Sequence, residues 1–470
     1  MLYFVKALAK PENRYVAWIA ALAALGGLLF GFDTGVVGSA EPYFSKALGI
    51  GTLGESWVVG SLLIGAIAGA AVAGYLADRI SRKWTKFAGG CVFCGAAIAS
   101  AFPPNVELLC ATRFVIGLGV GTASFVAPMY ISEQSPRRLR GGMTALNQLM
   151  ITFGIMVAYL SDYAFSGVGA DNWRWMFGIE AVPGAALAVA MVFVPHTPRW
   201  LVQEGREEQA KGVLRRTRPA DDVDAEVGDI KNTVRKQRGT RVWQALTSSY
   251  LRPFLAIGVV LAALQQLVGI NAVIYFGAQD LKFMGFTTGT AVYEAITIGI
   301  VNFVFALIAV LVLDWLGRRV MLLISCAGML ASLSLEGLYW YQGTAWASAH
   351  AIYGLGATLA FLAFFELGMG PVMWLIISEI YPLRVRSKAM AVATMCNWIF
   401  NFLVSYFYLT MFKPAVLGQA GTTWLFAGFA LIAFGFTWWK VPETKNRSLE
   451  EIETEIVGSS EPEGPEQRAA

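Results

Sequence analysis

The chain has 470 residues, of which 56% are apolar and only 14% are charged, with a formal net charge of +4. Soluble proteins carry roughly 25% charged residues, so this chain lacks the polar surface that a water-soluble fold of its size needs. The composition therefore excludes an ordinary soluble protein and predicts an all-α membrane protein.

Apolar stretches long enough to cross a hydrocarbon core recur along the chain. In the first half we expect spans at Tyr15–Val37, Trp57–Leu76, Phe87–Phe102, Val106–Tyr130, Thr144–Phe165 and Trp175–Val194. In the second half we expect them at Leu251–Gly277, Ala291–Leu313, Val320–Tyr341, Ala349–Ser378, Ala389–Met411 and Thr423–Trp439. The domains predicted are a six-helix bundle over 1–195, cytoplasmic linker helices over 196–250, a second six-helix bundle over 251–440 and a cytoplasmic tail over 441–470.

The positions of the basic residues support this topology. With both termini cytoplasmic, inside segments hold 30 of the 36 Lys and Arg residues, and outside segments hold only Lys46, Arg174, Lys282 and Lys413. This asymmetry is what the positive-inside rule requires. The net positive charge therefore reflects topology, and we expect no nucleic acid as a partner.

Charged motifs recur at matching places in the two halves. Asp-x-x-x-basic-basic follows the second and eighth spans, and a Glu with an Arg seven residues on follows the fourth and tenth. A single motif would suggest ordinary interfacial charge, but repetition favours a shared role at the interface of two repeats. We interpret these residues as a cytoplasmic latch between the halves: Asp78, Arg82, Glu133, Arg140, Asp314, Arg318, Arg319, Glu379 and Arg386.

Two ionisable residues lie deep in spans of the first half, Asp33 in the first and Arg113 in the fourth. Charges inside a membrane are costly and mark function by default. One interpretation is a static ion pair. The sharper hypothesis is a proton relay, because a movable guanidinium would make the carboxyl's affinity for a proton depend on conformation. Glu180 also lies in a span, but the sequence shows no partner for it and predicts no role.

Side-chain amides gather in the spans of both halves, with two indoles nearby. Amides offer donors and acceptors that match sugar hydroxyls, and indoles can cover the apolar face of a sugar ring. Amides also join helices to one another, so this alternative stays open for each of them. Gly269 and Gly370-Pro371 should interrupt their helices and free backbone groups toward a cavity.

The sequence shows no nucleophile–base pair, phosphate loop or metal-binding cluster. We therefore expect no enzyme activity, no catalytic residue, no cofactor and no metal. The expected partners are a monosaccharide, protons and the lipid bilayer, and no obligate protein partner is evident. A sugar-sensing receptor is disfavoured because the tail from residue 440 is short.

At these residues the chain resembles the sugar porter family of the major facilitator superfamily. The matching motifs include Gly27-Leu-Leu-Phe-Gly-Phe-Asp33, Pro195-x-Thr-Pro-Arg-Trp-Leu201, Gln265-Gln266-x-x-Gly-Ile-Asn271, Gly370-Pro-x-x-Trp374 and Pro442-Glu-Thr-Lys-x-Arg-Ser-Leu449. The resemblance implies a twelve-helix fold of two six-helix repeats working by alternating access. It also implies a sugar site at Phe30, Gln148, Ile155, Gln265, Gln266, Asn271, Asn302, Gly370, Trp374, Asn397 and Trp398, with Tyr275 at an outer gate.

Three departures shape the expected activity. Asp33 is similar to the aspartate of sugar–proton symporters, whereas Ile155 and Asn397 resemble facilitative glucose transporters. Ser81 replaces the usual glycine after the second span. We therefore expect proton-coupled symport of a neutral monosaccharide, a hexose such as glucose rather than a pentose. An uncoupled facilitative uniporter and a polyol or inositol symporter are the alternatives. The expected location is a cell membrane, with the bacterial inner membrane as the first expectation.

Overall fold

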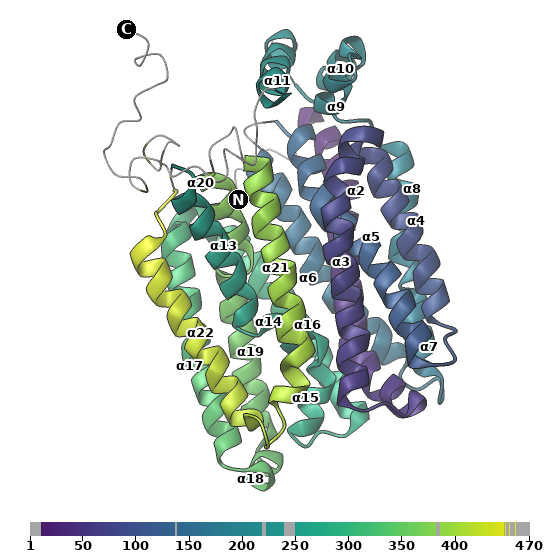
Figure 1. Cartoon of the computed structure of the whole chain (residues 1–470), viewed down its shortest axis with the longest axis vertical. Helices are drawn as coiled ribbons and strands as arrows, with labels where there is room; N and C mark the ends of the chain where they lie inside the picture. The colour runs from purple at the N-terminus through teal and green to yellow at the C-terminus, as the bar shows by residue number, and fades with distance from the viewer. Residues whose placement is uncertain are drawn as a thin grey trace.

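The computed structural model describes residues 11–136, 139–218, 222–238, 250–381 and 386–445, together with Arg447, Glu451 and Ile456. These residues form twelve membrane-crossing helices in two six-helix repeats. Figure 1 shows the two bundles side by side, with the short linker helices at one end. We call that end the basic end, because the loops rich in Lys and Arg lie there, and the other the opposite end.

The first bundle begins with a helix that is much longer than the sequence predicts. Its elements are α2 (Pro11–Leu48), α3 (Thr52–Ile80), α4 (Arg82–Ser100), α5 (Val106–Gln134), α6 (Arg140–Phe165), α7 (Asn172–Ile179) and α8 (Ala181–Phe193). The first span was expected to end at Val37. The prediction was wrong because polar residues after Val37 are buried by neighbouring helices and the helix continues.

The sixth span of the sequence analysis is divided at Glu180 into α7 and α8. Pro183 explains the break, because proline has no N–H to donate to the carbonyl of Ile179 four residues earlier. The third helix, α4, is shorter and less apolar than its neighbours. Of the described helices, eleven are long and apolar enough to cross a membrane by composition alone. The three basic residues in the first turns of α4 (Arg82, Lys83 and Lys86) account for its absence from that set.

Short helices join the bundles, as expected: α9 (Pro198–Gln203), α10 (Glu207–Leu214) and α11 (Val223–Arg238). Arg218 connects these short helices to the first bundle through an ion pair and hydrogen bonds. Its guanidinium lies 2.8 Å from Glu226 and donates to the carbonyls of Gln134 and Ser135 at the end of α5, at 3.1 and 3.0 Å. A cation there also complements the negative end of the helix dipole.

The second bundle repeats the first with two interrupted helices. Its elements are α13 (Arg252–Leu267), α14 (Ile270–Tyr275), α15 (Gly277–Phe283), α16 (Thr288–Leu316), α17 (Arg318–Tyr341), α18 (Thr344–Ala349), α19 (Ala351–Leu367), α20 (Pro371–Ile380), α21 (Arg386–Met411) and α22 (Gly418–Lys440). The breaks between α13 and α14 and between α19 and α20 fall at Gly269 and at Gly370-Pro371, as the sequence predicts.

The surface of the bundles suits a lipid environment. Many large apolar side chains are exposed along the helices, and exposed aromatic residues lie near both ends. Trp315 and Trp439 are 78% and 76% exposed at the basic end, and Tyr341 is 70% exposed at the opposite end. Aromatic rings at both ends of apolar helices are typical of the two interfaces of a bilayer.

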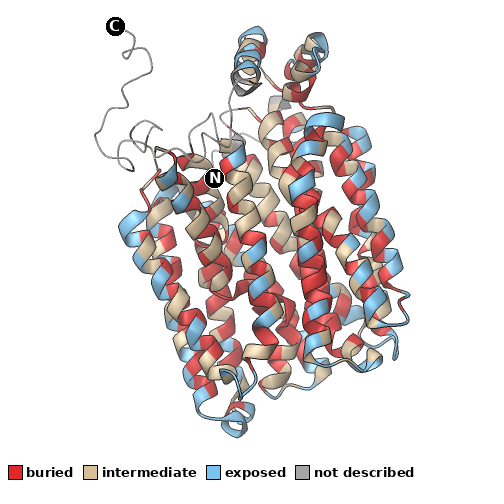
Figure 2. Cartoon of the chain, viewed as in Figure 1, coloured by how far each residue is buried: buried red, intermediate tan, exposed pale blue. Residues whose placement is uncertain are grey.

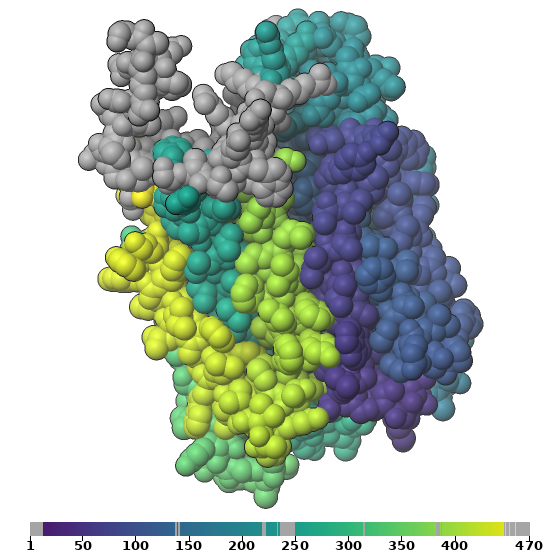
Figure 3. Space-filling view, viewed as in Figure 1, coloured from purple at the N-terminus to yellow at the C-terminus, as the bar shows by residue number. Residues whose placement is uncertain are grey.

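The two bundles pack against each other through α3 with α21 and α6 with α16, and α2 contacts α14 and α15. Figure 3 shows the first of these contacts on the near face. Every residue of 31–42 in α2 and of 272–278 in α14 and α15 is buried, whereas residues 144–148 of α6 and 394–396 of α21 are half-buried. Figure 2 shows the same contrast between the ends. The bundles are therefore closed at the opposite end and less tightly packed at the basic end.

Candidate functional site

Four amide side chains meet where α13 ends, and we call them the amide cluster: Gln265, Gln266, Asn271 and Asn397. Gln266 Nε2 donates to Asn397 Oδ1 at 3.1 Å, and Asn271 Nδ2 donates to Gln266 Oε1 at 2.7 Å. Asn397 Nδ2 donates to Gln265 Oε1 at 2.8 Å. Gly269 makes the cluster possible, because its φ of +90° turns the chain so that Asn271 faces back to Gln266.

The broken helix of α19 and α20 borders this cluster. Gln265 Nε2 donates to the carbonyls of Met369 and Gly370, at 2.9 and 3.2 Å. Pro371 has no backbone N–H, so the carbonyl of Leu367 four residues earlier loses its helical partner and the helix is interrupted here. Ser325 accepts a hydrogen bond from the N–H of Met369 at 3.0 Å. Side chains of the second bundle thus hold the unwound backbone in place beside the amides.

The first bundle supplies an aromatic ring to the same region. Phe30 on α2 packs against Trp398 on α21 with ring centroids 5.3 Å apart. Tyr275, expected at an outer gate, is fully buried on α14 near Thr34 of α2 and Asn401 of α21, and its hydroxyl makes no hydrogen bond within the described residues. The region therefore lies between the two bundles and draws side chains from both.

The remaining residues expected to bind sugar are less directly connected to this cluster. Gln148 and Asn302 both lie near Glu366 of α19, and the amide of Asn302 is fully buried without a hydrogen bond to the described residues. Ile155 is 3% exposed and packs against α2. Trp374 is half-buried on α20.

A second constellation, the charged trio of Asp33, Arg113 and Glu180, lies wholly inside the first bundle. Arg113 Nη1 lies 2.6 Å from Asp33 Oδ1 and 3.5 Å from Glu180 Oε1, and none of the three side chains is exposed. The guanidinium also stacks over the ring of Phe177 at 5.3 Å. The sequence analysis noted Glu180 but predicted no role for it, although its place in an apolar span three residues before Pro183 was a usable signal. One cation thus faces two carboxyl groups.

The residues expected to form a latch lie at the basic end in two matching groups. Arg82 lies 3.0 Å from Asp78 and 3.2 Å from Glu133 in the first bundle. Arg318 lies 3.3 Å from Glu379 in the second. These contacts join neighbouring helices of the same bundle, whereas the sequence analysis expected a latch between the two halves.

The other expected latch residues are less informative. Arg386 Nε donates to the carbonyl of Tyr381 at 3.0 Å. Arg319, at the start of α17, donates its backbone N–H to the carboxylate of Glu443. The side chains of Arg140 and Asp314 lie outside the described part of the structure.

The two repeats differ at one position, and the difference changes the charge at that position. Glu443 accepts the backbone N–H groups of Arg318 and Arg319, at 3.0 and 3.1 Å, and so caps α17. The corresponding place in the first bundle holds His196, whose ring stacks on Trp200 at 4.7 Å. Burial lowers the pKa of His196, and the nearby charges of Lys83 and Arg206 lower it further.

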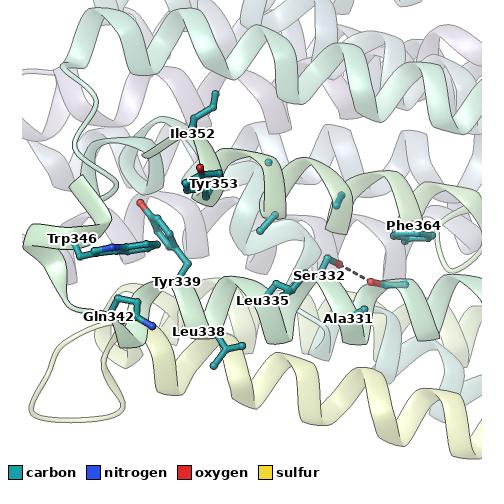
Figure 4. A pocket seen from close by; sticks show the side chains of 14 residues that line it. Ala331, Ser332, Leu335, Leu338, Tyr339, Gln342, Trp346, Ile352, Tyr353 and Phe364 are labelled. Atoms are coloured by element: carbon teal, nitrogen blue, oxygen red, sulfur yellow. Dashed lines mark hydrogen bonds between the residues drawn. The ribbon is translucent and has the colours of Figure 1, made fainter. Parts of the chain in front are cut away.

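A groove of about 590 Å³ lies elsewhere, between α17 and α19. Figure 4 shows its lining, which includes Leu335, Tyr339, Trp346 and Tyr353. The Ser332 hydroxyl in its wall already donates to the carbonyl of Gly328 at 2.7 Å. An apolar groove of this kind does not match the hydroxyl groups of a sugar, so we do not place the sugar there.

Comparison with known proteins agrees with this geometry. Residues 19–456 match the family described as sugar (and other) transporter. The arabinose–proton symporter of Escherichia coli K12 is 36% identical over 454 residues, covering 95% of each chain. The galactose–proton symporter of the same strain is 36% identical over 451 residues, covering 95% of this chain and 96% of that one. The proton:xylose symporter XylE bound to 6-bromo-6-deoxy-D-glucose superposes with a TM-score of 0.82, at 30% identity over 95% of this chain and 100% of that one.

Proposed function

Because this chain belongs to the sugar transporter family of the major facilitator superfamily and is not an enzyme, we propose that it carries a neutral monosaccharide across a membrane together with a proton. The observation that supports coupling is the charged trio. The one guanidinium of Arg113 neutralises one carboxylate, so the second carboxyl group is cheapest to bury when it holds a proton. The relatives of this chain that are named as sugar–proton symporters support the same proposal.

The proton would act through Arg113. Loading a proton on Asp33 removes its attraction for the guanidinium, which can then turn toward Glu180. Asp33 lies three residues from Phe30 on α2, the helix that contacts the second bundle beside Trp398. A change in the trio can therefore alter how α2 packs at the sugar region, and this links proton binding to alternating access.

The amide cluster supports a neutral, polyhydroxylated substrate. Its side chains currently bond one another, and a sugar hydroxyl can replace each of these bonds with one of equal kind. Arg113 is fully buried against two carboxyl groups and offers no free cation to an anionic substrate. We propose a hexose such as glucose rather than a pentose. A polyol or inositol fits the same chemistry and is the second candidate.

The membrane placement follows from the basic residues. We propose that the basic end and both termini are cytoplasmic and that the membrane is a bacterial inner membrane. The structure, closed at the opposite end, then corresponds to a state closed to the outside. We further propose that the two groups around Arg82 and Arg318 act as a cytoplasmic latch, and that the functional units are 1–195, 196–250, 251–440 and 441–470.

Uptake into proteoliposomes tests the proposal, with glucose, galactose, xylose and myo-inositol compared with and without an inward proton gradient. We expect a hexose to accumulate above its outside concentration and a protonophore to collapse the accumulation. Equilibration that ignores the gradient would identify an uncoupled uniporter and leave the trio a structural ion pair.

A further inference from the structure

Two glutamates of the first bundle are buried together at the opposite end, where α2 ends and α3 begins. Glu41 on α2 is fully buried and Glu55 on α3 is 6% exposed. Their carboxyl groups interact with each other. Among the described residues, no donor forms a hydrogen bond with either oxygen of Glu41. Glu41 is therefore a buried acid that interacts with a second acid and accepts no hydrogen bond within the described ranges.

The charged groups around this pair come mostly from the second bundle. Lys282 and Asp280 on α15 act on Glu41, and Lys282 and Lys413 act on Glu55. Neither lysine is within ion-pair distance of the glutamates; Lys282 instead donates to Gln279 at 3.2 Å. Asp280 accepts a hydrogen bond from Tyr408 at 2.7 Å.

Two further groups complete the surroundings of this stretch of α2. On the α6 side, Asp162 is fully buried near Ser39, and neither side chain makes a hydrogen bond within the described residues. Within α2, Ser45 interacts with Glu55. Neither group supplies the cation that two adjacent carboxylates would need.

Two adjacent carboxylates buried without a close cation would be very costly, whereas one proton shared between them removes one charge and makes one strong hydrogen bond. We propose that Glu41 and Glu55 bind one proton between them when the opposite end closes, and release it to water when that end opens. The O–H of one carboxyl then donates to the carboxylate of the other. This acid pair is a proton site at the gate, separate from the charged trio.

The position of the pair explains why closure would control the proton. α15 packs against α2 and completes the burial of residues 31–42. Opening this end moves α15 away, admits water and lets both carboxyl groups ionise and repel each other. Acid on that side therefore favours closure. This inference rests on the proposed alternating access, but not on which sugar is carried.

Spin-label distances across the opposite end test the acid pair. L53C on α3 and G289C on α16 place labels at exposed positions of the two bundles, after the five native cysteines are replaced. The background carries Asp33→Asn, so that titration of Asp33 does not contribute. We expect the distance to lengthen as the pH rises from about 5.5 to about 8.5.

Three variants decide the outcome. Glu41→Gln with Glu55→Gln should hold the distance short at every pH, since two neutral side chains mimic the protonated pair. Lys282→Met should move the opening transition to higher pH by about one unit, because it removes a cation that favours ionisation. Glu107→Gln, an exposed acid at the same end, should change nothing. A double Gln variant that opens with pH as its parent does would overturn the proposal.

Proton-driven uptake by the wild-type protein, measured beside the label distances, separates this inference from the proposed function. If symport is wrong, uptake by the wild-type protein ignores the proton gradient while the pH response of the labels persists. If the acid pair is wrong, gradient-driven accumulation persists and the double Gln variant leaves the label response unchanged.

Discussion

Asp33 and Arg113 show at the scale of single residues why a buried charge is informative. Their atoms lie 2.6 Å apart with no exposed surface, and Glu180 places a second carboxyl group 3.5 Å from the same guanidinium nitrogen. A static ion pair would need only one acid. The surplus acid is the observation on which the proposed proton site rests.

Asp33→Asn should therefore abolish accumulation of sugar against its gradient while sparing sugar counterflow. The amide keeps the size of the side chain but cannot take up and release a proton. Proteoliposome uptake measures accumulation, and exchange of labelled sugar across preloaded vesicles measures counterflow. Equal loss of both activities would indicate damage to the fold or to the sugar site instead.

Gln266 and Asn271 test the amide cluster in the same way. Gln266→Ala or Asn271→Ala should each weaken sugar binding about tenfold, the effect of losing about one hydrogen bond to a buried hydroxyl. Binding to purified protein checks this directly. Gln419→Ala, in the first turn of α22, serves as the matched control and should leave the affinity unaltered. Unchanged affinity in both test variants would remove the amides from the sugar site.

At the scale of elements, matching turns begin α4 and α17. Ser81 has φ +90° and ψ 154°, and Gly317 has φ +93° and ψ 160°. Ser81 is the one non-glycine residue with positive φ within the described ranges. Its side chain accepts the N–H of Trp84 at 3.3 Å, and this bond offsets part of the backbone strain.

Gly317→Ala should lower the stability of the second bundle by about 1–3 kcal/mol. The added Cβ would lie 2.8 Å from a carboxylate oxygen of Glu443, the residue that caps α17. Thermal unfolding in detergent measures the loss. Gly356→Ala is the control, because its Cβ would meet no atom within 4 Å in the middle of α19. Similar stabilities of the two variants would contradict the strain argument.

His196 predicts a pH dependence for the linker helices. Its pKa is lowered in the folded protein by burial and by nearby cations, so the unfolded chain binds the proton more readily. The folded state therefore keeps this contribution above the ordinary pKa of about 6.5 and loses it as the pH falls below that value.

Thermal unfolding between about pH 7.5 and pH 5.5 should show that acid destabilises the wild type more than His196→Gln. His350→Gln, which changes the only other histidine of the sequence, should retain the wild-type acid sensitivity. Identical acid sensitivity of wild type and His196→Gln would show that this ring does not titrate with unfolding.

For the whole molecule, closure of the opposite end depends on a close approach of α2 to α14. A Cβ on Gly38 would lie 2.3 Å from the carbonyl oxygen of Ile274, which also accepts the Tyr159 hydroxyl at 3.0 Å. The backbones of the two bundles therefore touch at Gly38, and only a residue without a side chain allows this contact.

Gly38→Trp should keep the opposite end open and stop net transport, while sugar still binds from that side. Accessibility of A278C on α15, which is fully buried in the closed state, reports the open end. Gly51→Trp is the control, because its Cβ meets no atom within 4 Å. Transport at the wild-type rate by Gly38→Trp would mean that this contact does not form during the cycle.

The sequence by itself determined the membrane class, the twelve helices, the two repeats and the breaks at Gly269 and Gly370-Pro371. These features depend on local chemistry, since an apolar run, a basic loop or a proline acts wherever it stands in the chain. The same local signals placed Asp33 and Arg113 inside spans and named amides that the structure joins by hydrogen bonds.

Only the tertiary structure decided which buried polar groups meet. Glu180 had no visible partner in the sequence because Arg113 stands 67 positions away, and only the packing of the bundle brings them together. Glu41 lies beyond the end of the first span that the sequence predicts. A local count of apolar residues contains no information on the packing of α3 and α15 that buries this acid. Burial is a property of the packed bundle, so the pairing of charges followed from the fold alone.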